Sequence, residues 1–115
     1  MQVTGVTVSV SDLSRSKAFY EEVLGFVPDA YYEPTRWQPY KFDGRAYFAI
    51  VEVPGFRRHA ASDIVNFHVQ EIEALWNRVR DQVEVEAELA DTPWGSYKFV
   101  IRDPDGCRLG FTGKK

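Results

Sequence analysis

The chain carries one pattern of apolar and polar positions twice. Val3–Val10 and Asp63–Val69 both alternate apolar and polar residues, which predicts two strands with one buried face each. Each strand leads, through an acidic residue, into apolar positions at helical spacing, over Leu13–Leu24 and Glu71–Val79. Because repeats dictate architecture, we expect two half-sized modules that share one core, with the groove between them as the natural ligand site.

Three more strands are expected after each helix. They are Phe26–Tyr32, Trp37–Phe42 and Arg45–Val53 in the first half, and Val83–Leu89, Tyr97–Ile101 and Arg108–Thr112 in the second. The order of elements is therefore β-α-β-β-β in both halves. We place the two modules at residues 1–57 and 63–115, with a linker at 58–62, inside a single domain.

Glycines mark the expected turns and the end of the first helix. Gly25 fits the position just past a helix C-terminus, where a left-handed residue is favoured. Asp43-Gly44 predicts a tight hairpin between two strands of the first module. Asp103–Gly106 predicts a turn of the second module in which Gly106 takes a positive φ.

Composition narrows the class of protein. The chain has 115 residues and 44% hydrophobic residues, enough for one packed domain, and 15% aromatic residues, which favours an apolar cleft or a subunit interface. A net charge of −3 argues against a nucleic-acid partner, and no apolar run reaches the ~20 residues of a membrane span. The sequence shows no signal peptide, and the single cysteine, Cys107, predicts a reducing, cytoplasmic setting.

Two motifs carry a family resemblance. Val10–Tyr20 with Leu24–Phe26 near the start, and Trp94-Gly95 with Asp103–Gly106 near the end, resemble the opening and closing signatures of the vicinal oxygen chelate superfamily. That superfamily includes glyoxalase I, bleomycin-resistance proteins and extradiol dioxygenases. The resemblance covers essentially the whole chain. It implies an α+β fold of two tandem βαβββ modules, a curled mixed sheet with a cup-shaped cleft, and often a homodimer.

The resemblance also implies where a metal would be held. In metal-using members, ligands stand seven residues before the acidic residue that precedes each helix, and four residues after the Asp-Pro-Asp-Gly turn. Those positions are Gly5, Ile64 and Gly110 here. The remaining ligand is usually a glutamate of the last strand of module one. Glu52 lies in that strand, but its register does not follow from the sequence.

These residue types are poor metal ligands. A divalent cation needs several N, O or S donors that converge at roughly 2.0–2.6 Å, whereas glycine has no side chain and isoleucine has only hydrocarbon. The two histidines of the chain, His59 and His68, are too few for a relocated histidine-rich site. We therefore expect neither a metal nor another cofactor.

Six residues are candidates for contacts with a small-molecule ligand: Trp37, Tyr40, Asn66, His68, Trp94 and Arg108. Flat aromatic side chains stack on planar ligands, and the polar groups would orient them. Each candidate has a structural alternative. Aromatic residues also fill cores and dimer interfaces, Asn66 and His68 can simply be hydrogen-bonded strand residues, and Arg108 can form a salt bridge to a carboxylate.

The sequence favours a metal-independent protein that sequesters a planar or aromatic compound, like the bleomycin-resistance branch that it resembles. One alternative is a metal-dependent lyase or dioxygenase of the glyoxalase type, with ligands that the sequence does not identify. Another is a metal-free enzyme with His68 as its only catalytic candidate, acting as a general base. A last alternative is a regulatory module without a ligand. A homodimer is expected in each case.

Overall fold

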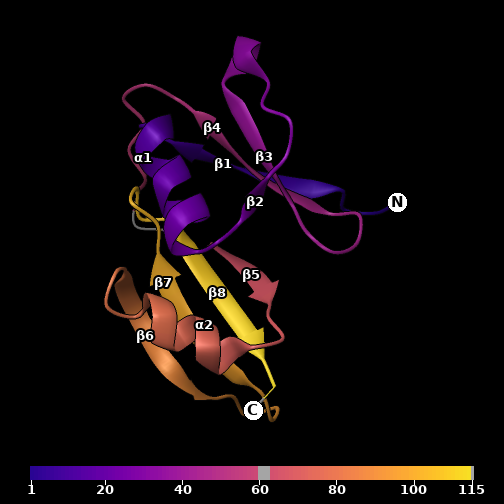
Figure 1. The fold of residues 1–115 in the computed structure, drawn as a ribbon, viewed down its shortest axis with the longest axis vertical. Coiled ribbons are helices and arrows are strands. Elements are labelled where there is room, and N and C mark those ends of the chain that lie inside the picture. The colour runs from indigo at the N-terminus through magenta and orange to yellow at the C-terminus, as the bar shows by residue number, and fades with distance from the viewer. Residues whose placement is uncertain (60–62, 115) are drawn as a thin grey trace. The chain divides into compact units, whose positions relative to one another are not determined.

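The computed structural model of the chain describes residues 1–59 and 63–114. The chain divides into two compact units, Met1–Arg57 (unit 1) and Arg58–Lys115 (unit 2), and each is described by itself. Each unit contains one four-stranded mixed sheet and a helical segment (Figure 1). The fold is therefore α+β with two βαβββ modules, as predicted. Residues 60–62 of the expected linker lie outside the described residues.

Unit 1 has a sheet with a parallel strand pair at one edge and antiparallel pairs in the rest of the sheet. Its elements are β1 (Gly5–Val10), α1 (Leu13–Lys17), η1 (Ala18–Val23), β2 (Val27–Pro28), η2 (Glu33–Thr35), β3 (Trp37–Lys41) and β4 (Tyr47–Glu52). The strand order is β1-β4-β3-β2. β1 pairs with β4 in parallel, and the other pairs are antiparallel.

A capping aspartate marks the start of the first helical segment, and a glycine follows its end. Asp12 is extended and its carboxylate accepts a hydrogen bond of 3.0 Å from the Arg15 N–H, so it caps the free donors of the first turn. After Lys17 the helix widens into the π-helical segment η1, which the sequence pattern did not predict. Gly25 follows with a φ of 79°, which confirms the predicted left-handed ending.

The predicted strand Phe26–Tyr32 is mostly wrong. Only Val27–Pro28 pairs as β2, and the chain then leaves the sheet before a short 3-10 helix and Arg36, whose φ is 54°. Pro28 has no N–H to donate to a ladder, which explains why the strand ends there. Tyr32 forms only an isolated bridge with Trp37.

Unit 2 repeats this order. Its elements are β5 (Ile64–His68), α2 (Ile72–Val79), β6 (Glu84–Asp91), β7 (Tyr97–Arg102) and β8 (Arg108–Gly113). The strand order is β5-β8-β7-β6, with β5 and β8 parallel and the other pairs antiparallel. All four strands and the helix agree with the predicted ranges to within a few residues. Gly106 has the predicted positive φ, at 89°.

β6 is an irregular, acidic edge strand. Its pairing with β7 shifts register between Val85 and Ala87 and again between Ala87 and Ala90. Its acidic residues are Glu84, Glu86, Glu88 and Asp91. Most of its side chains are exposed, so β6 contributes little to the core.

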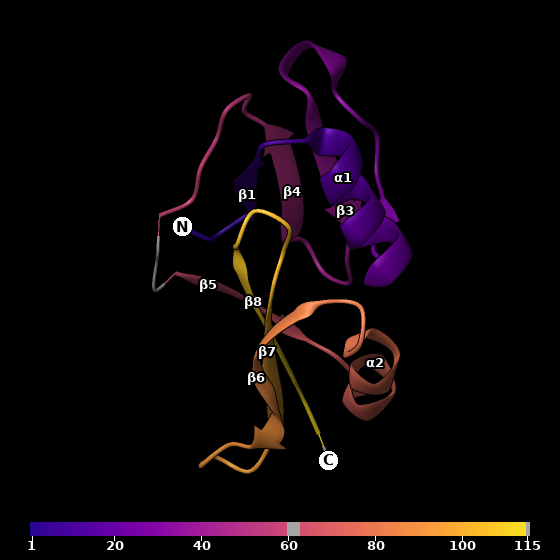
Figure 2. The same ribbon diagram turned by 90° about the vertical axis from the view of Figure 1, so that its left-hand side faces the viewer.

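Each sheet has a helix-covered face, and the core of each unit lies there (Figure 2). In unit 1, Tyr20, Phe48 and Ile50 are at most 2% exposed, and the ring centroids of Tyr20 and Phe48 are 5.2 Å apart. In unit 2, Phe99 stacks on Phe111 at 5.0 Å. Burial of each such side chain contributes about 1.5–3 kcal/mol. The opposite face of each sheet, which we call its open face, carries the alternate residues.

Within residues 1–59 and 63–114, none of the helices combines the length and the apolar character that crossing a membrane requires.

Candidate functional site

The open face of unit 1 is built from alternate residues of three paired strands. Strand register places Gly5 beside Tyr47, Thr7 beside Ala49, and Ser9 beside Val51. β3 adds Trp37, whose register partner is Val51. Because β-strand side chains alternate between faces, these residues lie opposite the buried Val8 and Val10 side of β1.

Gly5 lies under the ring of Tyr47. A Cβ added at Gly5 would overlap Cγ, Cδ2 and Cε2 of that ring, so any other residue at this position requires the Tyr47 ring to move. Gly5 is the first position at which the resemblance implies a metal ligand. Here the space that a ligand side chain would need is filled by Tyr47.

Trp37 and Tyr47 form an aromatic pair on this face. Their ring centroids are 5.6 Å apart and their planes meet at 82°, an edge-to-face arrangement. The Trp37 Nε1–H donates a hydrogen bond of 3.2 Å to the Thr7 hydroxyl. The indole therefore reaches across β4, and Ala49 of β4 is completely buried. Two partners fix the Trp37 ring, which remains partly exposed.

Tyr40 is a core residue, and its assignment as a ligand contact is corrected. It lies three residues after Trp37 on the same strand, so alternation turns it to the helix-covered face. Its side chain is 1% exposed, and its hydroxyl donates a hydrogen bond of 2.8 Å to Glu21. Burial, with a smaller effect of Glu21, raises the pKa of Tyr40 far above its ordinary value.

Glu52 also faces away from the open face. It pairs in register with the buried Val10. One carboxylate oxygen accepts a hydrogen bond of 2.8 Å from the Leu13 N–H, and the other lies 3.0 Å from Arg36 Nε. The carboxylate thus caps the start of α1 and balances a cation, which leaves it unsuited to hold a metal on the open face.

The open face of unit 2 consists of three rows of residues across β7, β8 and β5. The middle row is Val100, Gly110 and Asn66, flanked by a row of Arg102, Arg108 and Ile64 and a row of Lys98, Thr112 and His68. A Cβ at Gly110 would overlap Asn66 Oδ1, and would lie 3.0 Å from Ile64 Cδ1 and 3.2 Å from Lys98 Cε. Neighbouring side chains therefore fill the position of the expected glutamate ligand.

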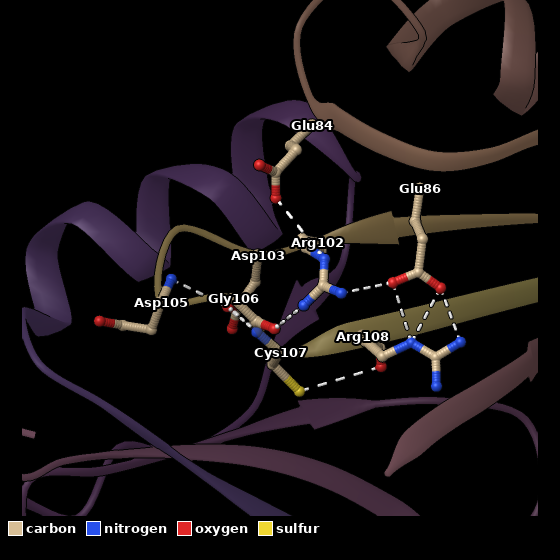
Figure 3. Close-up of polar contacts among 8 residues, drawn as sticks. All are labelled: Glu84, Glu86, Arg102, Asp103, Asp105, Gly106, Cys107 and Arg108. Atoms are coloured by element: carbon tan, nitrogen blue, oxygen red, sulfur yellow. Dashed lines mark hydrogen bonds and ion pairs between the residues drawn. The ribbon is translucent and has the colours of Figure 1, made fainter. Parts of the chain in front are cut away.

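Arg108 forms a salt bridge, the structural alternative weighed for it. Its Nε donates to both oxygens of Glu86, at 2.9 and 3.0 Å, and its Nη2 lies 2.6 Å from Oε2 (Figure 3). Arg102 binds the same carboxylate at 2.6 Å and also contacts Glu84. Hydrogen bonding and charge from Arg108, with help from Arg102, lower the pKa of Glu86. The same pairing raises the pKa of Arg108.

The turn before β8 is organised by a buried carboxylate. Asp103 is 4% exposed, and its Oδ1 accepts hydrogen bonds from the N–H groups of Asp105 and Cys107, at 2.9 and 2.8 Å (Figure 3). Cys107 is itself 5% exposed. Burial, more than the nearby Asp103 charge, raises the pKa of its thiol to about 11, so it is a neutral, unreactive group at physiological pH.

The other candidates are accessible. His68 is exposed at the end of β5, and Asn66 is exposed beside Gly110. Trp94 is 73% exposed, in a turn that the Thr92 and Ser96 hydroxyls brace at 3.0 Å. The structure thus brings Asn66, His68 and Arg108 to the open face of unit 2, and Trp37 to that of unit 1.

The donor chemistry does not fit the metal that the family fold implies. Gly5 and Gly110 have no side chain that could ligate a metal, and the side chains of their neighbours lie over both of them. Ile64 offers only hydrocarbon. The Glu52 carboxylate accepts a hydrogen bond from the Leu13 N–H on the other face of the sheet. Across residues 1–59 and 63–114, no three His, Cys, Asp or Glu side chains are grouped so that they could hold a metal ion.

Sequence reasoning missed two residues as members of the open faces. Tyr47 is not among the six candidate contacts, although its register with Gly5 decides what fills that position. Lys98 was not considered, yet it lies beside Gly110 and Asn66. Hairpin spacing could have revealed both, because the residues facing a glycine follow from strand register.

A family model of the Glyoxalase/Bleomycin resistance protein/Dioxygenase superfamily matches residues 2–111. The chain belongs to this superfamily. A comparison with curated protein sequences finds no match.

Several solved structures share the fold of this chain. A glyoxalase/dioxygenase from Nostoc punctiforme is 10% identical with a TM-score of 0.83, over 99% of this chain and 91% of the other. A lactoylglutathione lyase from Agrobacterium tumefaciens is 22% identical with a TM-score of 0.74, over 97% and 92%. TioX from Micromonospora sp. ML1 is 18% identical with a TM-score of 0.78, over 100% of both chains. At these identities the similarity shows the fold alone.

Proposed function

We propose that this glyoxalase-superfamily protein binds a planar aromatic small molecule without a metal and acts by sequestering it. The observation that carries the proposal is the open face of unit 1. There Gly5 stands where a metal ligand is expected, and the Trp37–Tyr47 aromatic pair occupies the same surface. A face that has aromatic rings and lacks metal-ligating side chains is suited to stacking and apolar burial rather than to Lewis-acid chemistry.

Preorganisation supports binding through Trp37. Its ring is held by the hydrogen bond to Thr7 and by the edge-to-face contact with Tyr47. A ring that is already fixed loses little conformational freedom when a ligand stacks on it, so more of the contact free energy becomes affinity.

The other contacts that we propose are polar or peripheral. On the open face of unit 2, Asn66 and His68 would contact a ligand through polar groups, and the exposed ring of Trp94 is a further proposed contact. Arg108 is also a proposed ligand contact, and its salt bridge to Glu86 would hold its side chain in place. Tyr40 is left out because it is buried in the core of unit 1.

We also propose that the protein works as a homodimer in a reducing, cytoplasmic setting. β1 lies at the edge of its sheet, and the apolar side chains of Val3, Val6 and Val53 are at least 38% exposed. An uncharged edge strand with exposed valines favours pairing with another chain. Sedimentation at micromolar concentration tests this, and a species of only 13.2 kDa would contradict it.

The test of the binding proposal compares two aromatic substitutions. Isothermal titration of the full chain with fused-ring compounds, such as acridine and 2-naphthamide, measures affinity directly. Trp37→Leu should weaken binding about tenfold or more, since a stacked ring contributes on the order of 1 kcal/mol or more with its buried area. Tyr31→Leu is the matched control, because Tyr31 is an exposed aromatic outside strands β1, β3 and β4.

Two results would contradict the proposal. One is equal binding by wild type and Trp37→Leu. The other is a stoichiometric metal in protein purified without chelator, which would restore the metal-dependent alternative.

A further inference from the structure

On the open face of unit 2, the row of residues that contains Lys98 has a positive charge that no acidic residue of the row balances. Register aligns Ala90 of β6, Lys98 of β7, Thr112 of β8 and His68 of β5, which we call the Lys98 row. Lys98 is partly buried on the sheet, and its neighbour on β6 is an alanine rather than an acid. The row therefore carries one full positive charge and no negative charge.

Two arginines on the same face, four residues from Lys98 on β7 and four residues from Thr112 on β8, have a carboxylate as counter-ion. Arg102 and Arg108 both bind the carboxylate of Glu86, at 2.6 Å each. The backbone of Lys98 pairs with the neighbouring strands, but among the residues that the structure describes its ammonium has neither a hydrogen bond nor an ion pair. A partly desolvated ammonium without a counter-ion gains free energy when an anion reaches it.

The surroundings of Lys98 supply further donors. Its Cε lies over Gly110, and the carboxamide of Asn66 lies over the same glycine from the β5 side. His68 follows on β5, two residues after Asn66, and is exposed. In the described part of the chain, neither Asn66 nor His68 uses its side chain in a hydrogen bond. An ammonium, an amide N–H₂ and an imidazole N–H together match the acceptor oxygens of a carboxylate or a phosphate.

We infer that the Lys98 row, together with Asn66, is a binding site for the anionic group of a small molecule, a carboxylate or a phosphate. The site stands on unit 2 alone and does not depend on the aromatic pair of unit 1. It also moves the anion site away from Arg108, because Glu86 already occupies the guanidinium of that residue. The proposed function requires only that the ligand be aromatic, whereas this inference requires that it also carry an anionic group.

Three probes with the same ring system test the inference on the full chain. They are 2-naphthoate, 2-naphthyl phosphate and the neutral 2-naphthamide, each titrated while the backbone amide signals of Gly110 and Asn66 are followed by NMR. We expect one or both anions to shift these signals and to bind about tenfold more tightly than the amide. The stronger of the two anions identifies carboxylate or phosphate as the preferred group.

Substitutions assign the effect to the ammonium. Lys98→Met keeps an unbranched side chain that reaches to Cε but removes the ammonium, and it should bring the anions within about twofold of the amide. Lys98→Arg keeps the charge and should retain the preference. Lys114→Met is the control for net charge, because Lys114 is exposed beyond the end of β8. Melting temperatures of all variants verify that they are folded.

Several outcomes would overturn the inference. They are equal affinities of the anions and the amide, an anion preference that survives in Lys98→Met, unmoved Gly110 and Asn66 signals, or no binding by either anion. Binding of 2-naphthamide with shifts at the Trp37 indole would still support the proposed function. The two proposals can therefore fail separately.

Discussion

The indole N–H of Trp37 donates a hydrogen bond of 3.2 Å to the hydroxyl of Thr7, and this bond joins two strands that do not pair with each other. β3 and β1 lie on either side of β4, so the side chain crosses the middle strand. The bond ties the first strand of unit 1 to the residue that we expect to contact a ligand. Its loss should therefore affect both stability and the position of the ring.

A double-mutant cycle measures this bond. Thr7→Val and Trp37→Phe each remove one partner, and each should lower the free energy of unfolding in urea. The pair is exposed, so its coupling free energy should be near the lower end of the usual range, about 0.5 kcal/mol. Thr4→Val is the control, since in the described residues the Thr4 side chain makes no hydrogen bond. Strictly additive single effects would show that the bond contributes nothing.

The fit between Gly5 and Tyr47 predicts a substitution that depends on its neighbour. Gly5→Ala places a methyl group against the Tyr47 ring and should destabilise unit 1 by about 1–3 kcal/mol, the usual cost of overpacking. In a Tyr47→Ala background the same substitution should cost much less, because the ring is gone. Chemical denaturation of the four proteins gives the comparison, and an unchanged cost in both backgrounds would refute the contact.

The pairing of Glu86 with two arginines predicts a pH-dependent contribution to stability. Its folded-state pKa is lowered from 4.5, so the ion pair stabilises the folded protein at neutral pH. That contribution falls as the pH falls through the folded-state pKa. The melting temperature of Glu86→Gln should accordingly lie below that of wild type at pH 7, and the difference should shrink toward pH 3.

Glu88→Gln is the matched control for this prediction. Glu88 lies two residues along β6 and is exposed, without an ion pair among the described residues. Its substitution should leave the difference in melting temperature close to zero at every pH. A pH-independent deficit in Glu86→Gln would mean that packing rather than charge is responsible.

Ser16 predicts a substitution that does not weaken the fold. It is completely buried in α1, and its hydroxyl has no hydrogen-bond partner among the described residues. Replacing it with alanine removes an unsatisfied polar group, which costs about 1–3 kcal/mol when buried. Ser16→Ala should thus be neutral or stabilising in thermal denaturation, and more favourable than Ser14→Ala at an exposed site of the same helix. A clear loss of stability would reveal a partner for the hydroxyl.

Local patterns predicted the order of the elements because they depend on neighbouring residues only. Alternation along β1 and β5, and the glycines at 25 and 106, fixed the strands and turns of both modules. The π-helical widening of η1 was missed, since its apolar spacing resembles that of an ordinary helix. β2 was overpredicted because Pro28 ends a stretch whose composition otherwise favours a strand.

The site was harder to predict because it depends on pairing between distant strands. Family spacing found Gly5, Ile64 and Gly110, but Tyr47 and Lys98 reach those glycines only through register. Alternation alone would have turned Tyr40 away from Trp37, three residues before it. The partner of Arg108 could not be found in the same way, since Glu86 belongs to a strand whose register shifts twice.

The irregular, acidic strand β6 has a consequence for the behaviour of the protein at high concentration. Shifted pairing and a line of glutamates make that border a poor template for fibril growth. β1 has neither safeguard, since it carries no charged residue from Gly5 to Val10. Any aggregation of the folded protein should accordingly start at β1 rather than at β6.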